Sequence, residues 1–283
     1  MVWEDMKMRK WKALFADIDG TLADKGENLM PETRNQLTRL HEAGVKIGLA
    51  TGRPMDPRIL DKARQWDLPF EFDMVIGLNG GELWTRDSGE TLKMHPLSTE
   101  SVHKVMDILE GEDVNAIIFR KGYEDVLCTR IDEFIEGSML RNCSHVRKVT
   151  RAVMEEEPAG KVEVQYPAHL QDHVMQLLAD HPDPAWITVA TFPGAVEFMD
   201  PRVTKGNALE LYARNQGIDP ADILAFGDMD NDISMLQAAG RGICLKNGSA
   251  PTKAAADAVT EFSVLEDGVG RYLRDHISDE EIA

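Results

Sequence analysis

The sequence is poor in cysteine. Only Cys128, Cys143 and Cys244 occur in 283 residues. Their number is odd and their spacing matches no metal-ligand pattern, which argues against a disulfide framework and against a thiolate-bound metal. Sparse thiols of this kind are typical of a reducing compartment, so we expect a cytoplasmic protein.

Long apolar runs are also absent. No segment approaches the roughly 18 consecutive apolar residues that a membrane-spanning helix requires. Residues 1–12 lack the continuous apolar stretch of a secretion signal. The expectation is therefore a soluble, intracellular protein without a membrane partner.

Positive charge is under-represented. The chain has 31 lysines and arginines against 49 aspartates and glutamates, a formal net charge of -18. Long-range repulsion from such a surface disfavours nucleic acids and anionic membranes as partners. An anionic ligand would need positive charge supplied locally, by a lysine, a metal ion or a helix N-terminus.

Both ends of the chain show short apolar runs that alternate with amphipathic segments. Strands are expected at residues 12–16, 45–50, 74–78, 223–226 and 242–245. The helices expected between them include residues 31–43, 57–66, 204–215 and 230–239. This alternation predicts an α/β fold with a Rossmann-like, doubly wound parallel sheet and helices on both faces.

The middle of the chain has a different pattern. The two strand-like runs within residues 114–128 suggest a hairpin, and residues 161–166 alternate strictly between polar and apolar side chains. Strict alternation predicts an antiparallel strand with one face in solvent. We therefore expect an α+β domain of residues 82–199, inserted into a core domain made of residues 1–81 and 200–283.

Two carboxylates follow the first expected strand. Asp17 and Asp19 are two residues apart at its carboxyl end, so both can point toward the mouth of the sheet, where open parallel sheets bind ligands. Gly20 permits a tight turn and Thr21 offers a hydroxyl. The same residues in isolation would also suit an ordinary loop or a helix cap.

A second acidic segment, residues 227–232, follows the strand expected at 223–226. Its four polar side chains, Asp228, Asp230, Asn231 and Asp232, suit a hard cation that prefers oxygen ligands. The alternative is a solvated first turn of a helix, where aspartate is favourable. A third polar cluster at a strand end, described next, argues against that alternative, because three such clusters in one chain are unlikely to be helix turns alone.

The third strand-end cluster is Thr51-Gly52-Arg53, where a hydroxyl and backbone N–H groups could bind an anion. Lys205 opens the first helix after the insertion. A lysine at that position opposes the helix dipole unless an anion or a carboxylate faces it. Considered alone, residues 51–53 could equally be an ordinary helix cap, and Lys205 could be an exposed surface lysine.

Together and in this order, these segments resemble the motifs of the haloacid dehalogenase superfamily. The motifs are DIDGT at 17–21, TGR at 51–53, TKG at 204–206 and GDMDND at 227–232. The insertion between the second and third motifs resembles a type IIB (Cof-like) cap. Further likeness at 79–81, 197–199, 247–259 and 266–269 extends the resemblance over nearly the whole chain.

The resemblance implies a role for each motif residue. Asp17 would attack phosphorus and form an aspartyl-phosphate, and Asp19 would act as general acid and then as general base. Thr51, Gly52, Lys205 and Asn231 would hold the phosphoryl group. Mg²⁺ would be bound by Asp17, by the backbone carbonyl of Asp19 and by Asp228, with Asp232 orienting the lysine or the metal's water ligands.

The implied function is hydrolysis of small phosphorylated metabolites, sugar phosphates among them, by a monomer or a homodimer. Asp19 favours phosphate-ester hydrolysis, because relatives that cleave carbon–halogen bonds lack a carboxylate there. A phosphomutase of the same superfamily is one alternative. A phosphate-binding regulatory protein without catalysis is another, although a binder would have no use for the nucleophile Asp17.

Overall fold

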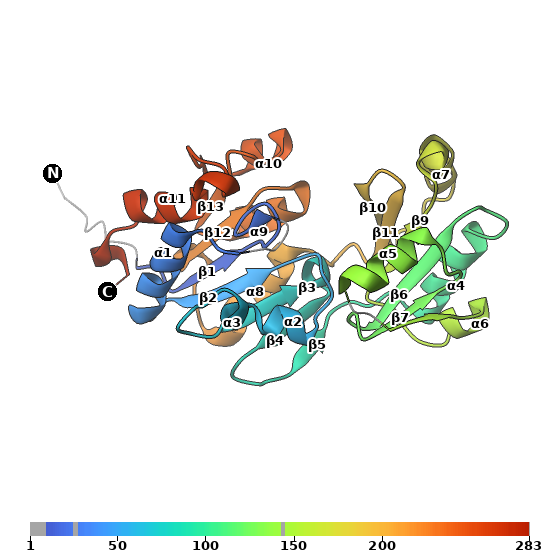
Figure 1. The fold of residues 1–283 in the computed structure, drawn as a ribbon, viewed down its shortest axis with the longest axis horizontal. Coiled ribbons are helices and arrows are strands. Elements are labelled where there is room, and N and C mark those ends of the chain that lie inside the picture. Colours follow the sequence, from blue (N-terminus) through green and yellow to red (C-terminus); the bar gives the residue numbers. More distant parts are fainter. Residues whose placement is uncertain (1–9, 25–27, 143–144, 283) are drawn as a thin grey trace. The chain divides into compact units, whose positions relative to one another are not determined.

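The computed structural model describes residues 10–24, 28–142 and 145–282 (Figure 1). The chain forms two compact units. The first unit comprises the residues up to Gly52, Pro57–Leu92 and the residues from Thr204 onward. The second comprises Arg53–Asp56 and Lys93–Val203.

The first unit is built on an eight-stranded sheet in the order β14-β13-β12-β1-β2-β3-β4-β5. The strands from β14 to β3 are parallel, whereas β4 runs antiparallel to β3. Their bounds are β1 Ala13–Ala16, β2 Lys46–Ala50, β3 Met74–Gly77, β4 Glu82–Thr85, β5 Thr91–Lys93, β12 Ile223–Gly227, β13 Arg241–Cys244 and β14 Ala258–Val259. Strand β1 is buried along its whole length, which explains its uninterrupted apolar sequence.

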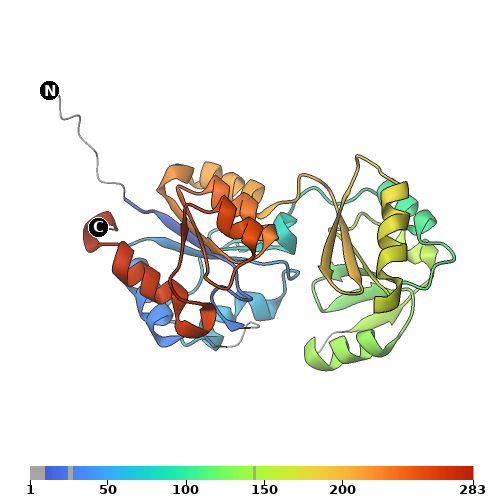
Figure 2. The same cartoon turned by 90° about the horizontal axis from the view of Figure 1, so that it is seen from above.

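Helices cover both faces of this sheet, α1 packing with α11 and α8 with α9 (Figure 2). Their bounds are α1 Pro31–Glu42, α2 Pro57–Leu60, α3 Lys62–Gln65, α8 Lys205–Gln216, α9 Ile233–Ala238, α10 Ala250–Ala255 and α11 Gly268–His276. The predicted doubly wound α/β class is thus confirmed. The single helix expected at 57–66 is instead two short helices, because Asp61 leaves the helical region with φ -88° and ψ 5°.

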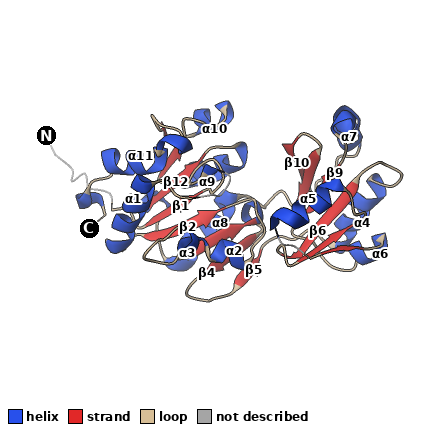
Figure 3. Ribbon diagram, in the orientation of Figure 1, coloured by secondary structure: helices blue, strands red, loops and turns tan. Residues whose placement is uncertain are grey.

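The second unit contains a six-stranded sheet in the order β10-β11-β9-β6-β7-β8, in which only the β7–β8 pair is parallel (Figure 3). Its strands are β6 Asn115–Lys121, β7 Asp125–Cys128, β8 Val146–Lys148, β9 Val162–Gln165, β10 Ile187–Phe192 and β11 Ala195–Met199. Its helices are α4 Thr99–Ile108, α5 Glu133–Asn142, α6 Arg151–Met154 and α7 Gln171–Asp180.

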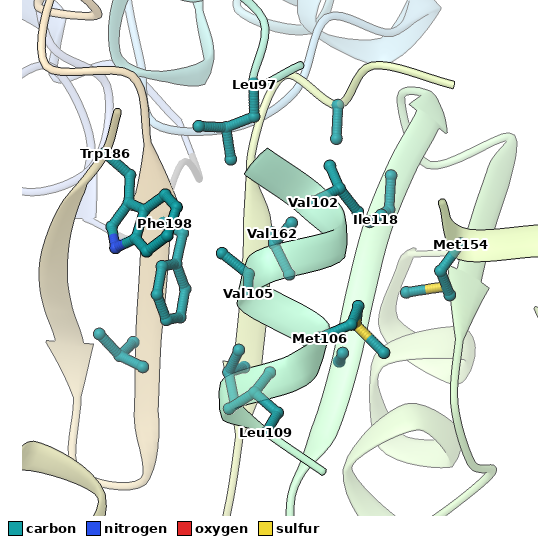
Figure 4. Close-up of a cluster of buried hydrophobic side chains, with 14 of the residues drawn as sticks. Leu97, Val102, Val105, Met106, Leu109, Ile118, Met154, Val162, Trp186 and Phe198 are labelled. Atoms are coloured by element: carbon teal, nitrogen blue, oxygen red, sulfur yellow. The ribbon is translucent and has the colours of Figure 1, made fainter. Parts of the chain in front are cut away.

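One face of the second sheet packs on an apolar core (Figure 4). Val102, Val105 and Met106 of α4 meet Val162 of β9 and Phe198 of β11 in this cluster. These strand residues alternate with polar neighbours, so the polar side chains occupy the opposite face.

The expectation that residues 161–166 have a face in solvent is wrong. Lys161, Glu163 and Gln165 are only 5%, 9% and 4% exposed. The physical reason is that side chains on the same face cover one another: those of β9 pair with one another and with Glu197 of β11, and the Lys161 Nζ lies 5.2 Å from the centroid of the Phe119 ring on β6. Alternation identified the two faces, but it did not show whether the polar one meets water.

The units divide at different residues from those expected. Strand β4 pairs with β3, which places residues 82–92 with the first unit rather than in the insertion. The chain re-enters the first unit at Thr204, the residue that caps α8. Among the described residues, no helix has both the length and the apolar character needed to cross a membrane.

Candidate active site

Two adjacent parallel strands bring distant carboxylates to one edge of the first sheet. Asp17 follows β1, and its backbone N–H donates to the carbonyl of Phe226 at 3.0 Å, which continues the β1–β12 pairing. Asp228 follows β12 directly. Both side chains are buried. Parallel pairing therefore explains why residues far apart in sequence meet at the carboxyl ends of these strands.

The loop after Asp17 closes tightly on Asp228. Gly20 has φ 92°, and a Cβ atom there would lie 2.4 Å from Asp228 Oδ2, so only glycine fits. The Thr21 hydroxyl donates to Asp228 Oδ1 at 2.8 Å. Asp19 lies in the same loop, is half-buried, and forms an isolated bridge with Ala23. The hydrogen bond of Thr21 was not anticipated from the motif.

Lys205 is the buried cation of this site. Its side chain is 0% exposed, and its Nζ donates to Asp17 Oδ1 at 2.6 Å and to Asp232 Oδ1 at 2.5 Å. The other oxygen of Asp232 accepts from the backbone N–H groups of Asp228 and Met229, at 2.9 and 3.0 Å. Asp232 thereby orients the lysine and braces the loop that carries Asp228.

Close backbone packing positions Lys205. Thr204 caps α8 by accepting from the backbone N–H of Asn207 at 3.0 Å. Gly80 has φ 109°, and a Cβ atom there would lie 2.1 Å from the Thr204 carbonyl oxygen. The segment after β3 thus lies directly against the start of α8, an approach that only glycine permits.

The remaining predicted residues gather around Asn79. Thr51 is buried at the end of β2, and its carbonyl accepts from the Asn79 backbone N–H at 3.0 Å. The Asn231 amide donates to Asn79 Oδ1 at 2.9 Å, and a Cβ atom on Gly52 would lie 3.1 Å from the same oxygen. Because β2 neighbours β1, this group lies at the same sheet edge as Asp17.

Asn79 was not among the predicted site residues, although it links the 51–53 and 227–232 motifs. Its φ of 56° is in the left-handed region, where asparagine is tolerated better than most residues. The sequence Asn-Gly-Gly directly after a buried strand was the available signal. Such a turn is required wherever the backbone must double back tightly.

The site holds more negative than positive charge. Asp17, Asp228 and Asp232 each place one carboxylate oxygen within 4.8 Å of the others, and all three are buried. Lys205 is the cation hydrogen-bonded within this group. Burial raises the pKa of Asp17 to about 8, against the lowering effect of Lys205, and burial raises the pKa of Asp228 to about 6.

The pKa of Lys205 is raised as well, which for a lysine favours the charged form. Burial alone would lower the pKa of its ammonium group, but Asp17 and Asp232 outweigh burial and raise it, so the lysine stays protonated. Three carboxylates beside one lysine leave an excess of negative charge. Oxygen-only ligands with this excess fit a hard divalent cation such as Mg²⁺. The donor set of the site thus suits the predicted cofactor.

The family model of the haloacid dehalogenase-like hydrolases matches residues 14–273. Among curated proteins, phosphoglycolate phosphatase of Methanoculleus marisnigri is 28% identical over 253 residues, 88% of this chain and 90% of that protein. The putative phosphatase YxeH of Bacillus subtilis is 26% identical over 269 residues, 94% of this chain and 98% of that protein.

Solved structures show the same likeness. The haloacid dehalogenase-superfamily phosphatase BT1666 of Bacteroides thetaiotaomicron has a TM-score of 0.77 at 25% identity, with 97% of each chain covered. The subclass IIB sugar phosphatase BT4131 shares the fold, with a TM-score of 0.78 at 24% identity over 93% of this chain and 98% of that chain. Because the family match spans every segment that builds the carboxylate–lysine site, the chain belongs to the haloacid dehalogenase-like hydrolases.

Proposed function

We propose that this protein is a Mg²⁺-dependent phosphatase that hydrolyses small phosphorylated metabolites through an aspartyl-phosphate on Asp17. The observation that carries the proposal is the buried Lys205, which is hydrogen-bonded to both Asp17 and Asp232 beside Asp228. A carboxylate held by a lysine, within a cluster suited to a hard cation, supplies both a nucleophile and the positive charge that stabilises phosphoryl transfer.

In the first half-reaction Asp17 acts as the nucleophile. Lys205 donates to Asp17 Oδ1, so we assign the attack to Oδ2. A bond forms between Oδ2 and phosphorus while the bond from phosphorus to the ester oxygen breaks. The leaving alkoxide takes a proton from Asp19, whose half-buried position in the adjoining loop suits exchange of protons with substrate and water.

The second half-reaction reverses the role of Asp19. Its carboxylate, now ionised, accepts a proton from a water molecule as the water oxygen attacks phosphorus. The bond between phosphorus and Asp17 breaks, which releases inorganic phosphate and restores the nucleophile. An acyl phosphate suits this step because it is readily hydrolysed.

The other residues would hold the phosphoryl group. Lys205 supplies positive charge, and Thr51, Gly52 and Asn231 surround Asn79 at the same sheet edge. When bound by Asp17, Asp228 and the Asp19 carbonyl, Mg²⁺ would favour the ionised form of Asp17 and neutralise negative charge on the phosphoryl oxygens. Asp232 orients Lys205 through the hydrogen bond between them.

The proposed substrates are small phosphorylated metabolites, with sugar phosphates as the first class to examine. One relative is named a phosphoglycolate phosphatase, which supports a small, highly polar substrate. The net charge of -18 supports the exclusion of nucleic acids.

The proposal is tested by measuring inorganic phosphate released from a panel of sugar, polyol and carboxylic-acid phosphates. Release should require Mg²⁺, stop in excess chelator and resume when Mg²⁺ is restored. Full activity in chelator would contradict the metal requirement. Transfer of the phosphoryl group to a second substrate molecule, without release of phosphate, would instead indicate a mutase.

The role of Asp19 predicts a difference between leaving groups. Asp19→Asn should slow formation of the aspartyl-phosphate from an alkyl phosphate by about 10²–10⁴-fold, the usual contribution of general acid catalysis. An aryl phosphate should lose less, because its leaving group needs little protonation. Single-turnover formation rates for the two substrates provide the measurement. Equal losses for both would contradict an acid role.

A further inference from the structure

The loop that follows β13, residues 245–249, contacts both loops that carry the carboxylates of the site. Ser249 donates through its backbone N–H to the carbonyl of Asp228 at 2.8 Å. Asn247 donates through its side-chain amide to the carbonyl of Gly20, also at 2.8 Å. Gly20 directly follows Asp19, so the second contact reaches the loop of the proposed general acid. Residues 245–249 thus support the site, although they supply none of its carboxylates.

Gly20 is the point at which the loop after β1 could most easily change conformation. Its φ of 92° suits glycine, which also has many other conformations available. Its backbone N–H donates to the Ala23 carbonyl at 2.9 Å, which fixes the peptide plane between Asp19 and Gly20. The bond from Asn247 fixes the following plane, because it holds the Gly20 carbonyl. Both dihedral angles of Gly20 are therefore restrained, and with them the placement of Asp19.

The side chain of Asn247 is itself anchored. Its Oδ1 accepts from the backbone N–H of Val264 at 2.9 Å. One partner is a carbonyl and the other an N–H group, so the amide has a single favourable orientation. Asn247 thereby joins the loop after β1 to the turn at residues 263–268, in which Ser263 and Glu266 form a capping box.

Asp267 fixes the 263–268 turn to the start of α1. Met30, at the N-cap of α1, provides no side-chain cap. Asp267 supplies one instead, because its carboxylate accepts from the backbone N–H groups of Glu32 and Thr33 at 2.7 and 2.9 Å. Helix α11, which begins at Gly268, packs against α1 (Figure 1). The turn is therefore a firm support to which Asn247 can tie a loop.

We infer that Asn247 is a positioning residue of the proposed phosphatase reaction and holds Asp19 at the leaving group through Gly20. The inference rests on the proposed function, because it concerns the acid–base step of Asp19. A general acid must lie within hydrogen-bond reach of the leaving oxygen, and a misplacement of about 1 Å can slow a reaction by roughly 10²-fold. Asn247 is exposed, so simple bracing of a surface loop is the alternative, and bracing would change stability alone.

Asn247→Leu tests the inference, since leucine has a similar size but makes no hydrogen bond. Single-turnover formation of the aspartyl-phosphate is measured with an alkyl and an aryl phosphate. The ratio of the alkyl rate to the aryl rate should fall at least about tenfold, because the alkyl leaving group depends far more on protonation by Asp19. A ratio that stays at the wild-type value, with or without a loss of stability, would overturn the inference.

Thr260→Val serves as the matched control. The buried Thr260 hydroxyl accepts from the backbone N–H of Lys246 at 3.0 Å and donates to the carbonyl of Phe262 at 2.6 Å. The substitution loosens the same loop but leaves the bond between Asn247 and Gly20 in place. It should lower the melting temperature and keep the wild-type rate ratio. An equal fall of the ratio in both variants would indicate general loosening of the loop and contradict a specific role for Asn247.

Asn247→Asp separates the two hydrogen bonds of the amide. An ionised carboxylate can still accept from the Val264 N–H, but it cannot donate to the Gly20 carbonyl. The rate ratio should therefore fall as it does in Asn247→Leu. A wild-type ratio in Asn247→Asp would show that the bond to Gly20 is not needed and would refute the inference.

Hydrogen exchange distinguishes this inference from the proposed function. The backbone N–H groups of Gly20 and Ala23 donate to the carbonyls of Ala23 and Ile18 at 2.9 and 3.0 Å. Relative to the amides of β1, they should exchange at least about tenfold faster in Asn247→Leu and at the wild-type rate in Thr260→Val. Unchanged exchange in Asn247→Leu overturns the inference, whether or not the wild type is active. If the wild type releases no phosphate, the proposed function fails, and faster exchange still supports the hold of Asn247 on the Asp19 loop.

Discussion

Asp17→Asn should lower kcat at least about 10⁴-fold, a rise of roughly 5.4 kcal/mol in the activation barrier. The amide has nearly the same shape as the carboxylate but cannot attack phosphorus. Its oxygen can still accept the hydrogen bond from Lys205, so the site should keep its geometry. The variant also has one fewer buried carboxylate, and its melting temperature without Mg²⁺ should not fall.

Phosphate release and thermal unfolding, measured on the same samples, check both parts of this expectation. Asp230→Asn is the matched control, because Asp230 lies in the 227–232 segment but is exposed and accepts from Ser249 and Thr252. That variant should keep wild-type turnover. Residual activity of Asp17→Asn within about tenfold of wild type, only ~1.4 kcal/mol in barrier, would exclude Asp17 as the nucleophile.

Lys205→Met should abolish turnover and also destabilise the metal-free protein. Methionine has a similar length but no charge, so the buried Asp17, Asp228 and Asp232 would lose their lysine. Removing one partner from a buried ion pair typically costs about 3–5 kcal/mol. Lys104→Met, at an exposed lysine, should change the free energy of unfolding by no more than about 0.5 kcal/mol.

The destabilisation should depend on pH. A carboxyl group whose folded pKa exceeds its unfolded value contributes stability at low pH and loses it as the pH rises through the folded pKa. Asp17, with a folded pKa of about 8 in the wild type, contributes the same pH dependence to both proteins below pH 8. Asp228 has a folded pKa of about 6, which Lys205 lowers, so removing the lysine raises it. The difference in unfolding free energy between wild type and Lys205→Met should therefore grow as the pH rises from about 6 to 8.

Denaturant unfolding of the metal-free proteins at pH 5 and pH 8 measures this difference. Mg²⁺ should restore part of the lost stability, because a cation bound to the folded state stabilises it by mass action. It should not restore turnover, since the proposed mechanism also uses the lysine to hold the phosphoryl group. A difference that shrinks with rising pH would contradict a net excess of buried negative charge at the site.

The sequence alone was sufficient to predict which polar residues follow each strand of the parallel sheet. A short apolar run such as residues 13–16 is sufficient to predict a buried strand, and the polar residues that follow must lie at its carboxyl end. Alternation of such strands with helices then predicts a parallel sheet, whose strand ends share one edge. That reasoning placed Asp17, Thr51 and Asp228 at one site, because it needs only local pattern and a general rule of topology.

The partners of each side chain were decided only by the tertiary structure. The sequence did not show that Lys205 joins Asp17 to Asp232, or that Asn79 joins Gly52 to Asn231, because these contacts depend on packing between segments far apart in the chain. Strand pairing likewise assigned β4 to the first unit. Period-two alternation located the polar face of β9, but its burial follows from neighbouring strands, whose order local sequence does not encode.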